Sequence, residues 1–288
     1  MPIPRKVLVR VVGAPLLLAI LGAILWFDHS RHSTMGLRGL LFAVCAVACL
    51  EFHGFCKARG IPTASVAGPI VAALAPVLVG LRGLDGRPIE WPPVALAGAF
   101  AIYVLLKTVF RYGSFPPEGA ALSFLGSVYV GMIALVLTPP SGNIDILWYL
   151  VFLVATSKGS DMAAYSAGKM FGKRKFAPQV SPNKTWEGTI AGALVGTAAG
   201  VVLLRLKLGG AYCHVPLAAL MPFALLVTMA GQVGDLVKSA FKRWAGVKDS
   251  GSLLPEFGGM LDMCDSFLLA VPVSHGASLV LFAVFKGA

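Results

Sequence analysis

Long apolar stretches recur along the whole chain and constrain its fold more than any other feature. They lie near 11–27, 36–56, 64–81, 92–110, 122–138, 144–160, 188–204, 215–234 and 264–285. A helix needs ~20 mostly apolar residues to cross a bilayer, and 57% of the 288 residues are hydrophobic whereas only 13% are charged. The sequence therefore predicts an all-α, polytopic transmembrane protein with about nine spans, and it excludes a soluble domain or a disordered chain.

The distribution of basic residues predicts the orientation of this protein. With the N-terminus in the cytoplasm, 17 of the 24 Lys and Arg residues fall on the cytoplasmic side, as the positive-inside rule requires. We therefore expect an N-in, C-out protein of a bacterial inner membrane. Its formal charge of +11 then suits anionic lipid headgroups and polyphosphates. Nucleic acid is not an expected partner, because the sequence offers no soluble basic domain.

The acidic residues indicate where function lies. We expect N-terminal transmembrane helices over 1–140 and a C-terminal catalytic part over 141–288, with cytoplasmic loops near 161–187 and 235–262. Seven of the thirteen acids lie in or directly beside these two loops, and in a chain so poor in charge this concentration is a functional signal. The seven are Asp161, Glu187, Asp235, Asp249, Glu256, Asp262 and Asp265.

Three aspartates suggest a metal site. Asp262 and Asp265 are three residues apart, so on a helix they share a face, and both begin an apolar run where an unpaired carboxylate costs several kcal/mol. Asp235 ends the preceding span. Carboxylates that act together with substrate phosphates and water suit Mg²⁺.

Basic residues between these aspartates could serve the same chemistry. The side chains of Lys242, Arg243 and Lys248 would place N–H groups that donate to phosphate oxygens next to the carboxylates. The alternative is a set of helix-end salt bridges, such as Asp235 with Lys238 or Lys248 with Asp249. Spacing alone leaves both interpretations open.

A glycine repeat predicts close helix packing. Gly188, Gly192, Gly196 and Gly200 recur every four residues within one apolar stretch. Such a face lets two helix backbones approach closely. We expect a contact of this kind either within the chain or between the subunits of a homodimer.

Two stretches of the C-terminal half contain closely spaced polar residues and glycines. The C-terminal stretch contains Ser239, Lys242-Arg243, Lys248-Asp249, Pro255, Gly258-Gly259, Asp262 and Asp265. The upstream stretch contains Ser160-Asp161, Gly168, Phe171-Gly172-Lys173 and the run from Ser181 to Gly188. Both stretches resemble the cytoplasmic motifs of phosphatidate cytidylyltransferases, also called CDP-diacylglycerol synthases. The family's C-terminal signature reads approximately Ser-x-x-Lys-Arg, four residues, Lys-Asp, then Pro-Gly-His-Gly-Gly-x-x-Asp-Arg-x-Asp. The resemblance covers about the C-terminal half of the chain.

The resemblance implies a Mg²⁺-dependent nucleotidyltransferase of phospholipid biosynthesis. Such an enzyme joins CTP to phosphatidic acid and releases CDP-diacylglycerol and pyrophosphate. It implies that Asp235 and Asp262 hold the metal with support from Asp265, and that Lys242 and Arg243 contact phosphates during catalysis. The implied substrate-binding residues are Ser181, Lys184, Glu187, Ser239, Lys248, Asp249 and Asp161.

The chain departs from the signature at three positions. Glu256 replaces the usual glycine, Phe257 the usual histidine and Met263 the usual arginine. Two phosphate donors are thereby lost, although the aspartates remain. Two other classes therefore stay open, a catalytically silent membrane scaffold and an anion transporter, although the sequence shows no duplicated halves of the kind many transporters have.

Overall fold

The computed structural model describes residues 19–31, 33–81, 89–111, 113–139, 144–206, 212, 214–251 and 258–285. Within this part of the chain, six helical segments are long and apolar enough to cross a membrane. They are α2 (Met35–Ala58), α4 (Trp91–Phe110), α5 (Pro117–Gly131) with the 3₁₀ helix η1 (Met132–Leu137), α7 (Trp186–Leu206), α9 (Leu217–Ala245) and α10 (Met260–Phe285). The expectation of a helical, polytopic membrane protein is confirmed.

Three of the predicted spans have a different outcome. The stretch near 64–81 forms only the short apolar helix α3 (Ala67–Leu78). The stretch near 144–160 begins α6 (Ile146–Phe171), whose second half is polar, and this helix is not among the six. The first stretch, 11–27, is described only from residue 19, where a helix runs from 19 to 30. The count of nine spans thus stays a prediction.

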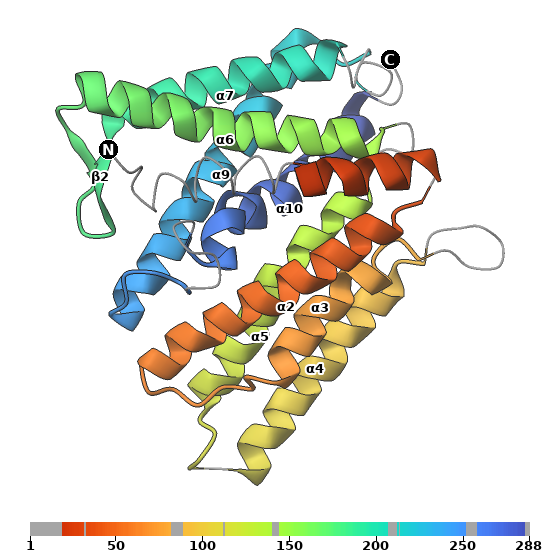
Figure 1. The fold of residues 1–288 in the computed structure, drawn as a ribbon, viewed down its shortest axis with the longest axis vertical. Helices are drawn as coiled ribbons and strands as arrows, with labels where there is room; N and C mark the ends of the chain where they lie inside the picture. Colours follow the sequence, from red (N-terminus) through yellow and green to blue (C-terminus); the bar gives the residue numbers. More distant parts are fainter. Residues whose placement is uncertain are drawn as a thin grey trace, which may run out of the picture. The chain divides into compact units, whose positions relative to one another are not determined.

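One compact unit consists of Met1–Leu137 together with Trp244–Met263. In it α2, α3, α4 and α5 pack side by side (Figure 1). Apolar side chains fill the interior where α4 meets α5 and the segment before α3. This cluster consists of Ala64, Phe100, Val104, Phe115 and Ala120, with Ala67, Val71 and Phe124 against it.

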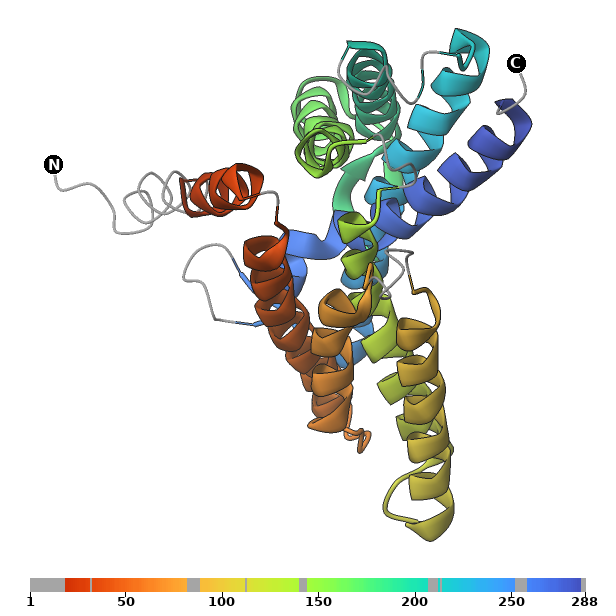
Figure 2. The ribbon, with the colours of Figure 1, turned by 90° about the vertical axis from the view of Figure 1, so that its right-hand side faces the viewer.

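The second compact unit consists of Thr138–Arg243 together with Cys264–Ala288. Helices α6 and α7 lie against each other along their length, as both views of the ribbon show (Figures 1 and 2). The glycine repeat of α7 makes this contact possible. A Cβ atom at Gly192 would lie 2.7 Å from the Ser160 carbonyl oxygen, and one at Gly196 would lie 2.7 Å from that of Thr156. The predicted close helix contact is therefore confirmed, and it lies within the chain.

A small antiparallel hairpin connects α6 to α7. Strands β1 (Lys175–Ala177) and β2 (Ser181–Thr185) pair with Lys175 opposite Thr185 and Ala177 opposite Ser181. The structure thus differs from the expected loop at 161–187, since α6 continues to Phe171 and most of the remainder is hairpin. Figure 1 shows the hairpin beyond the end of α6 and the start of α7.

Candidate active site

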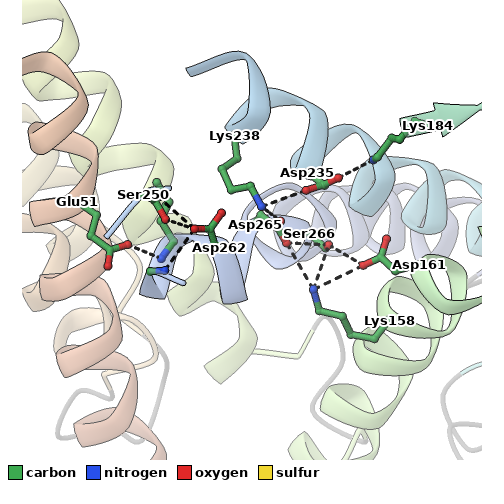
Figure 3. A network of polar contacts seen from close by, with 12 residues as sticks. Glu51, Lys158, Asp161, Lys184, Asp235, Lys238, Ser250, Asp262, Asp265 and Ser266 are labelled. Carbon is green, nitrogen blue, oxygen red and sulfur yellow. Dashed lines mark hydrogen bonds and ion pairs between the residues drawn. The ribbon is translucent and has the colours of Figure 1, made fainter. Parts of the chain in front are cut away.

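An alternating chain of ammonium and carboxylate groups crosses the interior of the second unit (Figure 3). Three lysines and three aspartates take part, so their formal charges balance. In order along the contacts, they are Lys184, Asp235, Lys238, Asp265, Lys158 and Asp161. We call this set the ion-pair chain.

The buried centre of the ion-pair chain is Lys238 on α9. Its Nζ lies 3.1 Å from Asp235 Oδ1, one helical turn earlier, and it also pairs with Asp265 Oδ2 on α10. Lys238 is 6% exposed and Asp265 is 4% exposed. Two charges at such burial are stable only when each has a partner and further hydrogen bonds. Lys238 therefore fixes α9 against α10 at this level.

The α6 side of the ion-pair chain has a similar arrangement. Lys158 Nζ lies 3.4 Å from Asp265 Oδ1 and 3.6 Å from Asp161 Oδ2, with Lys158 and Asp161 three residues apart on α6. Buried Ser266 links the same groups, because its backbone N–H donates to Asp265 at 2.6 Å and its hydroxyl donates to Asp161 at 3.4 Å. Burial raises the pKa of the Asp161 carboxyl, an effect that Lys158 opposes. Lys158 thus favours the ionised form of Asp161.

The other end of the ion-pair chain comes from the hairpin. Lys184 on β2 places its Nζ 2.6 Å from Asp235 Oδ2. The next residue, Thr185, ends β2, and its hydroxyl accepts the Gly188 N–H at 3.2 Å, which caps the start of α7. Phe176 of β1 packs edge-on against Trp186 with the ring centroids 4.6 Å apart. These contacts hold the hairpin so that Lys184 lies over α9.

A cavity of about 460 Å³ opens beside the ion-pair chain. Asp161, Lys184 and Asp235 reach its wall, whereas Lys238 and Asp265 do not line it. Its remaining lining comes from α6, the hairpin, α7 and α9: Ala164, Tyr165, Gly168, Lys169, Phe176, Asn183, Thr185, Gly188, Thr189, Gln232 and Leu236. A volume of this size is typical of small-ligand sites, which lie in the range of roughly 300–1,000 Å³. The wall offers carboxylates, ammonium groups and aromatic faces to one ligand.

A second polar cluster lies within the first unit, at the start of α10 (Figure 3). Asp262 Oδ2 accepts hydrogen bonds from the Ser250 hydroxyl, from the Ser250 backbone N–H at 3.3 Å and from the Gly259 N–H at 3.3 Å. The Gly258 backbone has φ +84°, a conformation that favours glycine. The Gly-Gly pair of the signature thus permits the tight turn that brings the Gly259 N–H to Asp262.

The donor set fits Mg²⁺ when substrate phosphates supply further oxygens. Within the described residues, no three His, Cys, Asp or Glu side chains gather as a metal-binding group. Mg²⁺, however, is commonly held by one or two carboxylates plus substrate phosphates and water. Asp161 and Asp235 are hard-oxygen donors on the wall of one cavity. Both oxygens of Asp265 already accept from lysines and Ser266.

The other predicted site residues have varied surroundings. Ser181 begins β2, Glu187 lies half-buried in the first turn of α7 and accepts from the Arg174 N–H, and Ser239 and Lys242 are half-buried on α9. Arg243 Nε donates to the Val180 carbonyl oxygen at 3.3 Å, which ties α9 to the hairpin. Lys248 and Asp249 are exposed in the loop before α10. Pro255, Glu256 and Phe257 lie outside the described residues, whereas Met263 is half-buried on α10.

The sequence of this chain is similar to those of known proteins. The sequence model of the Cytidylyltransferase family matches residues 8–281. The chain belongs to this family. Phosphatidate cytidylyltransferases similar to it include one from Staphylococcus epidermidis, 34% identical over 83% of this chain and 88% of that protein, and one from Bacillus subtilis, 36% identical over 60% of this chain. A third, from Chlamydia pneumoniae, is 43% identical over 45% of this chain. The matched segments span 64% of the Bacillus protein and 42% of the Chlamydia protein, less than two thirds of either.

The structure of this cytidylyltransferase family member adds four residues that the sequence did not indicate as site residues. They are Lys238, Lys158, Ser266 and Glu51. Lys238 forms the expected salt bridge with Asp235, and it also pairs with Asp265 on α10. Lys158 is a member of the ion-pair chain, and Ser266 forms hydrogen bonds with Lys158 and Asp161 of that chain. Glu51, which lies more than 200 residues earlier in the chain, contacts the turn that carries Asp262. A charged residue inside an apolar stretch was the one signal for Glu51.

Proposed function

We propose that this protein transfers the cytidylyl group of CTP to phosphatidic acid, forming CDP-diacylglycerol and pyrophosphate. Membership of the Cytidylyltransferase family supports the reaction class. The observation that carries the proposal is the cavity whose wall combines Lys184 with Asp161 and Asp235. Such a wall offers both a cation for phosphate oxygens and carboxylates for a phosphate-bound metal.

The reaction places defined demands on the site. A phosphate oxygen of phosphatidic acid attacks the α-phosphorus of CTP, and the bond from that phosphorus to the oxygen bridging to the β-phosphate breaks. Pyrophosphate leaves with the bonding electron pair, so negative charge grows on the leaving group. Lys184 lies at the cavity wall where its ammonium group can donate to a phosphate oxygen, and Lys242 and Arg243 are further proposed phosphate donors. Positioned cations of this kind stabilise the transition state.

We infer that Asp235 and Asp161 offer carboxylate oxygens to Mg²⁺ at the cavity. Bound Mg²⁺ would neutralise phosphate charge and orient the phosphates. Asp262 remains a proposed metal ligand on the strength of the resemblance. Asp265 supports the site by holding Lys238 and Lys158, which face Asp235 and Asp161. The charge balance of the ion-pair chain keeps this arrangement stable before substrate arrives.

A transfer assay tests the proposed function. Purified protein in detergent with Mg²⁺, CTP labelled in the cytidine and phosphatidic acid should yield a labelled, organic-soluble lipid and one pyrophosphate per lipid formed. Omitting phosphatidic acid should abolish both products. Absence of labelled lipid from folded protein would reject the enzyme and favour a scaffold. Uptake of labelled CTP into lipid vesicles without lipid labelling would indicate an anion transporter.

The topology belongs to the same proposal. Nine spans with the N-terminus inside would place both 161–187 and 235–262 in the cytoplasm, where CTP is available. The 17 basic residues predicted for that side support this orientation. A homodimer would need a surface other than the glycine face of α7, because α6 fills that face.

Labelling of introduced cysteines checks the topology. Lys173→Cys and Lys248→Cys should resist a membrane-impermeant maleimide added to right-side-out vesicles and react after detergent is added, since both positions are exposed in the structure. His29→Cys, exposed and predicted to lie outside, should react in both conditions. Each variant is compared with the parent protein to subtract labelling of native cysteines. Labelling of Lys173→Cys or Lys248→Cys before detergent would overturn the proposed orientation.

A further inference from the structure

Glu51 lies near the C-terminal end of α2, and its carboxylate accepts two hydrogen bonds from the start of α10. We call this pair of hydrogen bonds the clasp. Oε1 accepts the Met260 N–H at 2.9 Å, and Oε2 accepts the Leu261 N–H at 2.8 Å. The first N–H groups of a helix have no partner within the helix. A carboxylate there also interacts favourably with the helix dipole. One side chain thus satisfies two such donors from a position more than 200 residues earlier in the chain.

The surroundings of this carboxylate are shaped for it. A Cβ atom at Gly259 would lie 2.5 Å from Glu51 Oε2, and one at Gly251 would lie 2.5 Å from Oε1. Any side chain at either glycine would therefore displace Glu51 or the backbone. Both glycines leave room for the carboxylate, which is half-buried.

The next residue along α10 is Asp262, so Glu51 acts on the turn that carries it. Asp262 receives its own hydrogen bonds from Ser250 and Gly259. The backbone of this turn is thus held by Glu51, and the Asp262 side chain is held by Ser250 and Gly259 (Figure 3). Without Glu51, two backbone donors would lose a charged acceptor and the first turn of α10 would fray.

We propose that Glu51 is a positioning residue for Asp262. Glu51 sets the direction in which the Asp262 carboxylate points. Glu51 belongs to neither sequence motif, and its effect passes through the α10 backbone rather than through contact with substrate. The catalytic consequence rests on the proposed function of Asp262, whereas the clasp itself rests on the hydrogen bonds alone. Two measurements therefore separate them.

Amide hydrogen exchange tests the clasp without reference to activity. In the full-length protein in detergent, Glu51→Gln keeps the side-chain volume but offers one acceptor oxygen and an amide nitrogen to two N–H donors. Exchange in the peptide covering 258–265 should rise by about tenfold or more, because a hydrogen bond to a charged group is lost. Glu118→Gln, the same change at an exposed site in the first turn of α5, should leave that peptide unchanged. Unchanged exchange in Glu51→Gln would overturn the proposal.

The Mg²⁺ requirement tests the positioning role. Glu51→Gln should raise the Mg²⁺ concentration for half-maximal lipid cytidylylation by about tenfold, within the range known for residues that orient metal ligands, with the thermal midpoint preserved. Glu51→Asp, which keeps both oxygens, should recover part of this loss, and it carries the test if Glu51→Gln fails to fold. Lower activity at an unchanged Mg²⁺ requirement would show a merely structural residue and reject the role. Inactive wild-type protein would reject the proposed function instead, while the exchange result would still decide the clasp.

Discussion

Asp235→Asn should lower lipid cytidylylation by about a hundredfold or more, the size of effect seen when one preorganised group that stabilises a transition state is removed. Asparagine keeps the volume of aspartate but removes the charge that attracts Mg²⁺ and that pairs with Lys184 and Lys238. Initial rates of labelled lipid formation across a Mg²⁺ titration would measure the loss. We expect no recovery at high Mg²⁺, because a neutral amide oxygen is a poor substitute for a carboxylate.

Asp145→Asn provides a matched control in the same unit. Asp145 is exposed and caps α6 by accepting the Leu147 N–H at 2.7 Å, and asparagine caps helices equally well. Its activity should equal that of the parent protein. Near-normal activity of folded Asp235→Asn, or full activity of the parent in excess chelator, would contradict the assignment. Asp262→Asn should behave like Asp235→Asn if the resemblance assigns its role correctly.

The second large effect concerns stability. Lys238→Met should destabilise the protein by about 3–5 kcal/mol, because removing one partner of a buried ion pair leaves an uncompensated charge. Asp265 would lose its closest cation while 4% exposed. The thermal midpoint in detergent should fall by about 10 °C, measured by tryptophan fluorescence. Lys173→Met, at an exposed position in the same unit, should change it little.

A double variant separates charge from packing. Adding Asp265→Asn to Lys238→Met removes the carboxylate that lost its partner. The double variant should therefore be more stable than Lys238→Met alone. If the double variant is the less stable protein, then the contribution of Lys238 comes from packing of its side chain rather than from its charge. A midpoint of Lys238→Met equal to that of the parent would show that the ion-pair chain does not hold α9 against α10.

The sequence alone predicted features that depend on neighbouring residues. Length and apolar content indicated several membrane-spanning helices, because a helix in a bilayer satisfies its backbone groups within its own segment. Helical spacing placed Asp262 and Asp265 on one face of α10, and the glycine repeat of α7 predicted a close helix contact. The two motifs indicated the family, since their residues occur at fixed local intervals.

Segment ends were harder to predict. Polar residues near Asp161 suggested a loop, yet α6 continues to Phe171, and a hairpin follows it. Hydropathy marks where a segment leaves an apolar environment, whereas a helix ends where its backbone hydrogen bonding ends. Packing of α6 against α7 supports the polar part of α6, which hydropathy does not detect.

Only the tertiary structure decided which charges meet. Lys184, Lys238 and Asp265 belong to three different elements, and their contacts depend on the packing of β2, α9 and α10. The clasp of Glu51 on α10 likewise joins residues more than 200 positions apart. Sequence composition and spacing contain the charges but not their partners, because an ion pair requires two side chains within about 4 Å and that separation is set by helix packing. The sequence therefore indicated a helical membrane protein and its family, and the packed helices determined the network around the cavity.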